Sequence, residues 1–432
     1  MAKPGAARQY LDRYAAPEAA AAEGIDIAFD HAIAIPVKAE DPAFIENLAG
    51  AVTGAGRVLA IVVINASAGD PARLHRENEA LDRALRGRSP PSQIIGPGVC
   101  RLQLDRELDV VVVDRFSPAR RLSPGQGVGL ARKIGCDLAL ALRARGRLRS
   151  RWIHTTDADA ALPRDYFDAS AEASAKSAAL VYPFWHDTSA SETGEALARY
   201  EISLRYYVLG LAAAGSPYAF HTLGSALAAD ADAYAAVRGV PKRTAAEDFY
   251  LLGKLAKIGP VARAACAPIR LRERLSDRVP VGTGPATQRI VAARAAGEAF
   301  RLYDPRVFSV LRTLRRAAGA FCESRDPTCL VGGRESGDEA LDAAYREAIA
   351  AIGAAAAFES AAAATTSAGA LARRIRDWLD GFRTLKLIHA ARDAGLPNRP
   401  WRDALASADF LAEKIDPSAD AYEIRSALAA AE

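Results

Sequence analysis

The chain has few of the residues that build metal clusters or disulfide frameworks. Its 432 residues include 5 cysteines and 6 histidines, and the cysteines are far apart and odd in number. No two cysteines form a Cys-x-x-Cys pair. This spacing speaks against a zinc site built from cysteines and against a disulfide framework.

Neither sign of charge dominates the composition. Lysine and arginine total 56 against 52 for aspartate and glutamate, which gives a net charge of +4. Nucleic-acid-binding domains usually carry clustered basic residues on one face or a recognisable module. The sequence has neither, so we expect no nucleic-acid partner.

Long apolar runs are also missing. The N-terminus lacks the basic segment and apolar run of a secretory signal. No apolar run reaches the ~20 residues that a membrane-spanning helix needs. We therefore expect a cytoplasmic protein without a transmembrane segment.

Short β-branched runs alternate with helical patterns between about Asp26 and Arg272. The predicted strands are Ile33–Pro36, Val58–Asn65, Asp109–Asp114, Trp152–Thr155 and Ala178–Pro183. The predicted helices are Pro42–Ala55, Pro71–Arg86, Gly125–Arg145 and Pro163–Lys176. This alternation predicts an α/β domain with a mostly parallel central sheet.

The pattern changes after Pro285, where the chain becomes rich in alanine and arginine with helical periodicity. We expect an N-terminal segment at residues 1–25, the α/β domain at 26–286 and a C-terminal helical extension at 287–432. The sequence leaves the oligomeric state open, a homo-oligomer included.

Polar or turn residues follow four of the predicted strands. Ligands of open α/β sheets bind beyond the carboxyl ends of the strands. Those ends carry Pro36 with Lys38 and Glu40, then Asn65, Asp114, and finally Thr156 to Asp159. Their coincidence predicts a ligand site at that edge of the sheet.

Asp157 and Asp159 directly follow the fourth predicted strand. In extended backbone, residues i and i+2 point to the same side, so the two carboxylates converge. Two negative charges this close repel each other unless a cation lies between them. Mg²⁺ or Mn²⁺ that also binds substrate phosphates could be that cation. The alternative is a solvated turn in which one carboxylate caps the next helix.

Glu247 and Asp248 precede an apolar helical pattern. A carboxylate at a helix start can act as a general base towards an attacking hydroxyl. The helix dipole alone also favours acidic residues there, so both interpretations stand. Arg132, near the start of the glycine-rich helix Gly125–Arg145, is a candidate for contacting a diphosphate, with ordinary solvent exposure as its alternative.

Three further segments are candidates for substrate contacts. Arg278 lies in an Arg- and Gly-rich loop that could fold over a pyrophosphate or simply link two domains. Trp185 and His186 follow a strand, where aromatic faces stack on sugars or fill a core. Gly224 and Ser225 lie beside a histidine at a position suited to an acceptor.

In their order along the chain, these residues resemble a family 2-like glycosyltransferase with the GT-A fold, over roughly the first two-thirds of the chain. Ile33–Glu40 resembles the family's opening strand, and Ile61–Ser67 with Val110–Asp114 resemble the strands lining the nucleotide base. Asp157-Ala158-Asp159 matches the metal-binding DxD motif. Gly224-Ser225-Ala226 resembles the acceptor-side segment, and Glu247-Asp248 matches the ED pair.

The resemblance implies a metal-dependent transfer of a sugar from a nucleotide-diphosphate sugar to an acceptor hydroxyl, inverting and non-processive. It implies that Asp157 and Asp159 hold Mg²⁺ or Mn²⁺ and that Asp248 is the base, with Glu247 beside it. Pro36, Lys38, Glu40, Asn65, Asp114, Arg132 and Arg278 would then contact the donor, and Trp185, His186, Gly224 and Ser225 the acceptor.

The sequence departs from the family pattern in three places. No histidine occurs in Leu275–Gly284, where related retaining glycosyltransferases often supply a third metal ligand, so the third ligand and the stereochemistry stay open. Lys38-Ala39 stands where Tyr-Asn or Arg-Asn is commoner, and the QxxRW motif of processive synthases is absent. Two rivals remain, a sugar-phosphate nucleotidyltransferase and a non-catalytic nucleotide-sugar-binding scaffold. The first usually carries a Gly-rich loop straight after the first strand, and Pro36–Pro42 has none.

Overall fold

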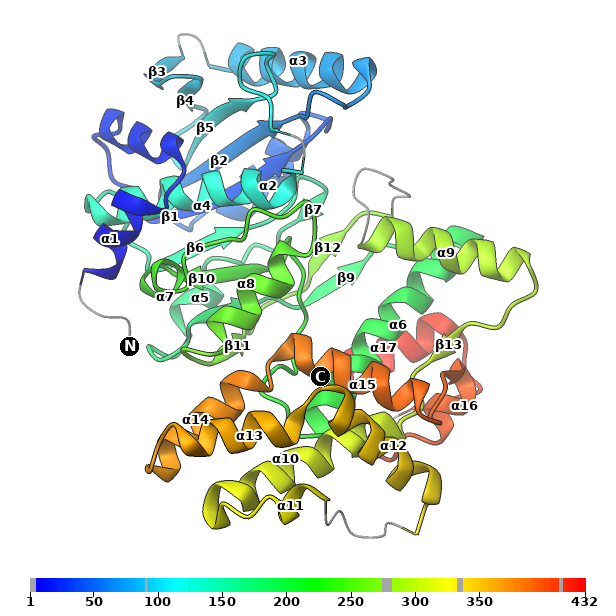
Figure 1. Ribbon diagram of the computed structural model, residues 1–432. Helices are drawn as coiled ribbons and strands as arrows, with labels where there is room; N and C mark the ends of the chain where they lie inside the picture. Colours follow the sequence, from blue (N-terminus) through cyan, green and yellow to red (C-terminus); the bar gives the residue numbers. More distant parts are fainter. Residues whose placement is uncertain (1–4, 90–91, 124, 274–281, 332–336, 412–414) are drawn as a thin grey trace. The chain divides into compact units, whose positions relative to one another are not determined.

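The computed structural model describes residues 5–89, 92–123, 125–273, 282–331, 337–411 and 415–432 (Figure 1). The chain forms two compact units. The first, which we call the α/β unit, comprises Met1–Asp187 and Thr222–Gly282. The second, the helical unit, comprises Thr188–His221 and Thr283–Glu432.

Within the described residues, nine strands form the central sheet of the α/β unit (Figure 1). Their order is β11-β8-β10-β6-β1-β2-β5-β4-β3, and of these β4 and β10 run against the others. The predicted mostly parallel sheet is confirmed. The strands are β1 (His31–Val37), β2 (Val58–Asn65), β3 (Gln93–Gly96), β4 (Val99–Gln103), β5 (Leu108–Arg115), β6 (Trp152–Thr155), β8 (Ala179–Val181), β10 (Leu227–Asp230) and β11 (Val261–Arg263).

The parallel centre of the sheet, β6-β1-β2-β5, is buried on both faces. Every residue of β2 is buried, as is usual where helices cover both sides of a parallel sheet. Helix α4 packs on β1, β2 and β6, and Gly135 makes this close approach feasible, since an added Cβ would lie 2.7 Å from Ala34 Cβ. The helices of this unit are α1 (Ala6–Arg13), α2 (Phe44–Val52), α3 (Ala72–Gly87), α4 (Val128–Ala144), α5 (Asp168–Ala171), α7 (Ala231–Ala236) and α8 (Glu247–Leu255), with a 3-10 helix at Pro17–Gly24.

One predicted helix is wrong. Pro163–Lys176 contains only the single turn α5. The indole nitrogen of Trp152 donates to the Ser170 carbonyl at 2.9 Å, and the Ser170 hydroxyl donates to the Phe167 carbonyl. These side chains use carbonyl groups that a continuing helix would need for its own backbone bonds.

A small three-stranded sheet begins directly after the paired aspartates. Its order is β7-β12-β9, with β7 at Ala160–Ala161, β12 at Ile269–Leu271 and β9 at Phe184–His186. Strand β12 is antiparallel to β7 and parallel to β9. This sheet links the segment after Asp159 with the segment that carries Trp185 and His186.

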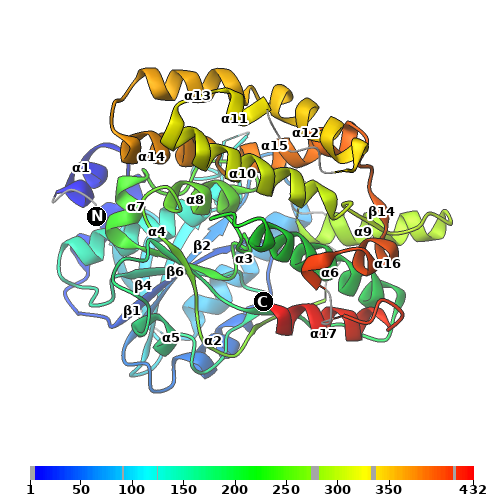
Figure 2. The ribbon, with the colours of Figure 1, turned by 90° about the horizontal axis from the view of Figure 1, so that it is seen from below.

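The helical unit confirms the predicted helical character of the C-terminal part. Its helices are α6 (Glu192–Ala213), α9 (Thr283–Ala295), α10 (Arg306–Ser324), α11 (Thr328–Val331), α12 (Glu339–Ala351), α13 (Ala354–Ala363), α14 (Ala368–Trp378), α15 (Gly381–Asp393), α16 (Trp401–Ala406) and α17 (Ala421–Ala431), with a 3-10 turn at Asp409–Leu411. Strands β13 (Arg301–Leu302) and β14 (Arg399–Pro400) pair in it. Helix α17 packs beside α6 (Figure 2).

The unit boundaries differ from the predicted ranges 26–286 and 287–432 in three respects. Residues 1–25, predicted as a separate N-terminal segment, belong to the α/β unit, and this unit ends at Gly282 instead of residue 286. Residues 188–221, which include α6, belong to the helical unit although they lie within the predicted α/β range. The cause is that Ile202 and Tyr206 of α6 are fully buried in the core formed with α10, α12 and α15. Across the described residues, no helix is both long and apolar enough to span a bilayer.

Candidate active site

Arg132, in the first turn and a half of α4, holds several of the predicted motifs together. Its guanidinium donates to Asp157 Oδ1 at 2.8 Å and to Glu247 Oε1 at 3.0 Å. It also donates to the Gly224 carbonyl at 2.8 Å and to the Thr155 hydroxyl. The end of β6, the loop before β10 and the start of α8 therefore meet around one side chain.

The side chain of Arg132 is 2% exposed, so the charge of its guanidinium depends on these partners. Burial opposes the charged form, but the carboxylates of Asp157 and Glu247 outweigh it and raise the pKa of Arg132. The approach needs Gly224, because a Cβ there would overlap the guanidinium. Arg132 is thus a permanent buried cation, engaged by protein groups rather than open to a donor diphosphate as the sequence suggested.

Asp157 and Asp159 are both half-buried, and the Asp157 side chain is 39% exposed. Within the described residues, no group of three or more His, Cys, Asp or Glu is placed to hold a metal ion. The segment after β6 supplies two carboxylates, Asp157 and Asp159, of which Asp157 already accepts from Arg132. That number fits Mg²⁺ or Mn²⁺, since such ions are commonly held by one or two carboxylates together with substrate phosphates and water.

Glu247 and Asp248 open helix α8. Glu247 is buried against Arg132, and Asp248 is half-buried with Oδ1 accepting from the Phe249 amide at 2.7 Å. Burial, and next the charge of Glu247, raise the pKa of Asp248 to about 7, although Arg132 acts in the opposite direction. A carboxylate that titrates near neutral pH is well suited to accept a proton.

The backbone just before this pair is strained. Ala246 has φ 60, a left-handed conformation that residues with a Cβ rarely adopt. Ala39, after β1, has φ 53. Non-glycine residues in this region persist where the surrounding structure holds them, and they cluster at functional sites.

The ends of β1 and β2 are fixed by a polar network. The Asn65 amide donates to the Val37 carbonyl at 2.9 Å, and the Asn78 amide donates to the Asn65 carbonyl at 3.0 Å. Asn78 Oδ1 accepts from the Ala39 amide at 2.8 Å. Asn65 therefore shapes the strand ends. Sequence reasoning missed Asn78, whose only signal is an uncharged polar residue on the buried face of α3.

Lys38, another predicted donor contact, forms an ion pair with Asp70 at 2.8 Å. Asp70 Oδ2 also accepts from the Ser67 amide at 2.8 Å. Burial raises the pKa of Asp70, but Lys38 and Ser67 outweigh it, so the net shift is downward. The sequence analysis did not single out Asp70, which braces the loops after β1 and β2.

The remaining predicted donor residues, apart from Arg278, lie on or just beyond β1 and β5. Asp114 Oδ1 accepts from the amides of Phe116 and Ser117 at 3.1 and 2.9 Å, which shapes the turn after β5. Pro36 is buried within β1. Glu40 is half-buried beyond β1. Arg278 lies outside the described residues.

The predicted acceptor residues fall in two places. Trp185 is half-buried and His186 is buried, both on β9 of the small sheet. Ser225 is buried, and its carbonyl accepts from the Thr156 hydroxyl at 3.0 Å. Gly224 and Ser225 therefore adjoin the segment of Asp157, while Trp185 and His186 connect to it through β12 and β7.

The comparisons with known proteins give distant likenesses. Solved structures similar to the chain include TarS 1-349 from S. aureus in complex with UDP-GlcNAc, at 12% identity and a TM-score of 0.37, covering 77% of this chain and 88% of that one. Mannosyltransferase PcManGT from Pyrobaculum calidifontis, in complex with GDP-Man and Mn²⁺, is 19% identical with a TM-score of 0.34, covering 90% and 92%.

No family model matches the chain. No curated protein matches it either. TM-scores below 0.5 do not establish a common fold, so the architecture and the site described above are read from this chain's own geometry.

Proposed function

We propose that the chain transfers a sugar from a nucleotide-diphosphate sugar to an acceptor hydroxyl, with inversion and without processivity. The observation that carries the proposal is the convergence of Asp157, Gly224 and Glu247 on Arg132. These residues belong to three of the motifs that carry the resemblance to family 2-like glycosyltransferases, namely the DxD motif, the acceptor-side segment and the ED pair. The convergence supports a single site formed by motifs that lie far apart in the sequence.

In the proposed site, Asp157 and Asp159 hold Mg²⁺ or Mn²⁺. The ion would neutralise charge on the departing diphosphate. Arg132 positions one oxygen of Asp157 and holds Glu247 away from the exposed edge of α8. Lys38, Asn65 and Asp114 lie at or just beyond the carboxyl ends of β1, β2 and β5, on the side where a nucleotide would bind.

Asp248 is the proposed base. It takes the proton from the acceptor hydroxyl as that oxygen attacks the anomeric carbon of the donor. The bond between this carbon and the diphosphate oxygen breaks, and its electron pair leaves with the nucleoside diphosphate. A pKa of about 7 keeps a substantial share of Asp248 ionised at neutral pH while leaving it basic enough to accept a proton.

The products released distinguish this proposal from its rivals. The purified chain would be incubated with Mn²⁺ and UDP-, GDP- or ADP-sugars, with simple sugars as acceptors and with water as the default acceptor. Release of nucleoside diphosphate supports glycosyl transfer. Formation of sugar nucleotide and pyrophosphate from a sugar phosphate and a nucleoside triphosphate would instead identify a nucleotidyltransferase. Stoichiometric binding without turnover would identify a scaffold.

A further inference from the structure

The helical unit contains a cavity of ≈ 550 Å³ between α6 and α9, which we call the α6–α9 cavity. Its walls are mainly apolar. They include Leu204 and Tyr207 from α6, Ile290 and Ala293 from α9, and Phe300 from the segment before β13. A concave, mostly apolar site of this size is typical of small-molecule binding.

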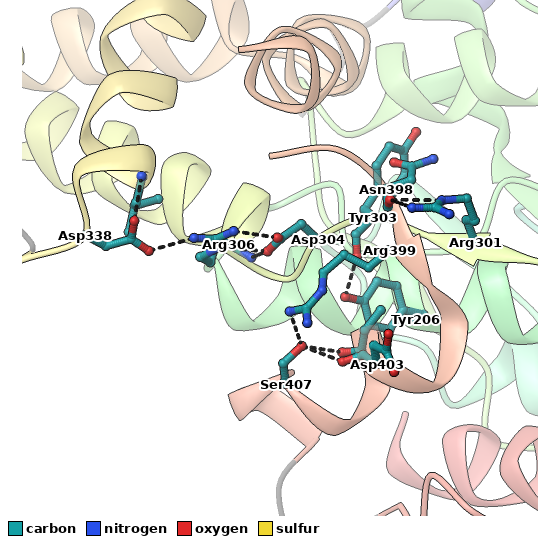
Figure 3. Close-up of polar contacts among 12 residues, drawn as sticks. Tyr206, Arg301, Tyr303, Asp304, Arg306, Asp338, Asn398, Arg399, Asp403 and Ser407 are labelled. Atoms are coloured by element: carbon teal, nitrogen blue, oxygen red, sulfur yellow. Dashed lines mark hydrogen bonds and ion pairs between the residues drawn. The ribbon is translucent and has the colours of Figure 1, made fainter. Parts of the chain in front are cut away.

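Two tyrosines that line the α6–α9 cavity, Tyr206 and Tyr303, are held in place by hydrogen bonds. The Tyr303 hydroxyl forms a hydrogen bond with His389 Nε2 at 2.9 Å. The Tyr303 carbonyl accepts from the Tyr206 hydroxyl at 2.9 Å (Figure 3). The rings of Tyr207 and Tyr303 lie 6.0 Å apart. The aromatic wall is therefore formed before any ligand arrives, which reduces the entropy lost on binding.

Four arginines lie among the residues that line this cavity, against one lining acid among the described residues, Glu298. Two of them, Arg199 and Arg294, share a carboxylate just outside the lining, that of Glu195. This shared ion pair joins α6 to α9 beside the cavity. The single carboxylate of Glu195 thereby compensates one of these two positive charges.

The other two arginines, Arg289 and Arg301, are exposed and have no carboxylate partner within the described part of the chain. Arg301 donates from Nε and Nη2 to the Asn398 carbonyl at 3.0 and 2.8 Å (Figure 3). That carbonyl orients the guanidinium without neutralising it. The cavity lining thus has an excess of positive charge, and two of its arginines, Arg289 and Arg301, are exposed to solvent.

We propose that the α6–α9 cavity binds an amphipathic anion, a hydrocarbon chain that ends in one carboxylate or phosphate. The chain lies against Leu204, Tyr207 and Ile290, and the anionic group meets Arg289 and Arg301. Burial of the chain supplies most of the affinity, and the arginines select for the negative end. This inference is independent of the proposed transfer reaction.

A nucleotide fits the same cavity less well. A base presents several polar atoms along its edge, and each needs a partner when buried. The Tyr303 hydroxyl is already bound to His389, and the remaining walls are largely aliphatic or aromatic carbon. A hydrocarbon chain has no polar atoms that need hydrogen-bond partners when it is buried.

The test is calorimetric titration of the full chain with dodecyl phosphate and with dodecanoate, each below its micelle concentration. Dodecanol, inorganic phosphate and AMP serve as comparison ligands. We expect saturable binding of one equivalent for at least one of the two anionic amphiphiles, and the two separate titrations tell phosphate from carboxylate recognition. Binding by dodecanol of equal strength, or tighter binding of AMP, would overturn the proposal.

Substitutions locate the binding. Ala293→Trp fills the cavity and should abolish binding, and Arg289→Glu combined with Arg301→Glu should weaken it by about tenfold or more because the anion loses both cations. Arg346→Glu on α12, an exposed arginine outside the lining, is the matched charge control and should bind as the wild type does. Thermal unfolding checks that each variant folds. Unchanged affinity in folded Ala293→Trp protein would place the ligand elsewhere and refute the inference.

Discussion

Arg132 Nη2 donates to Asp157 Oδ1 at 2.8 Å, so one half of the paired-aspartate motif is already bound to a buried cation. The same guanidinium holds Glu247. The charge of Asp157 is therefore partly compensated before any metal arrives. In the proposed mechanism, this weakens binding of the metal alone and favours binding together with a donor diphosphate, whose negative charge restores the balance.

Replacing Arg132 by Met should destabilise the protein by about 3–5 kcal/mol, because Glu247 would be left buried without a counter-charge. Urea unfolding measures this. Exposed Arg346→Met is the matched control and should change the unfolding free energy by less than about 0.5 kcal/mol. The double variant Arg132→Met with Glu247→Gln should recover part of the loss. If Arg132→Met changes the free energy of unfolding no more than Arg346→Met does, the charge of Arg132 is not needed to stabilise buried Glu247.

Gly224→Ala should displace the Arg132 guanidinium, since the added Cβ would overlap it. We expect loss of nucleoside diphosphate release with only moderate loss of stability. Gly253→Ala, in α8 where nothing lies within 4 Å of an added Cβ, is the control and should be neutral or stabilise by up to about 1 kcal/mol. Wild-type turnover by Gly224→Ala would show that the position of Arg132 does not matter for transfer.

The raised pKa of Asp248 predicts the pH dependence of activity. A base must be ionised, so kcat/KM should rise with pH through about 7 and level off above it. Asp248→Asn should abolish turnover while leaving donor binding intact. A wild-type profile that is flat between pH 5.5 and 8.5 would contradict the role of Asp248.

The same pKa predicts a change in stability. An unfolded aspartate titrates near 3.9. Between about pH 4 and 7 the folded protein therefore retains a proton that the unfolded chain releases, and stability falls as pH rises through this range. Asp248→Asn should make that dependence shallower and raise the thermal midpoint at pH 8 relative to the wild type. If the pH dependence of stability is the same in Asp248→Asn and in the wild type, the pKa of Asp248 is not raised in the folded protein.

Asp137 anchors the N-terminal helix α1 to α4. Its buried carboxylate accepts from Tyr10, Tyr234 and Lys133 and from the Ala16 amide at 2.7 Å. Asp137→Ala should cost about 3–5 kcal/mol in urea unfolding because the Lys133 ammonium would be left without its counter-ion. Asp82 is the comparison, because it pairs with Arg86 within α3 and the two side chains are 20% and 34% exposed. Asp82→Ala should cost about 1 kcal/mol or less. Equal effects of the two substitutions would contradict the anchoring role.

The sequence predicted the parallel centre of the sheet well because those strands are buried on both faces. Val58–Asn65 and Trp152–Thr155 coincide with β2 and β6 to the residue. Continuous apolar runs of this kind leave little ambiguity. The antiparallel edge β3–β4 was missed because Gln93 and Ile94 are exposed and carry no alternating pattern.

The site was predictable as a set of strand and helix ends, but not as a network. The sequence indicates that Asp157 and Glu247 lie near ligand-binding edges. It does not indicate that Arg132, 25 residues before Asp157 and 115 before Glu247, joins them. These contacts depend on how α4 packs across the sheet, and the local pattern of apolar and polar residues does not predict that packing. The contacts of Asn78 and Asp70 with the loops after β1 and β2 were not predicted for the same reason.

The most direct test of the central claim is the effect of Asp159→Asn on binding of Mn²⁺ together with a nucleotide-diphosphate sugar. Asp26→Asn, at a side chain 93% exposed, is the matched control. Calorimetry would measure donor affinity with and without Mn²⁺ for the wild type and both variants. We predict that Mn²⁺ strengthens donor binding in the wild type and in Asp26→Asn, and that Asp159→Asn loses this enhancement while remaining folded. An enhancement of the same size in Asp159→Asn would contradict the metal site and the mechanism built on it.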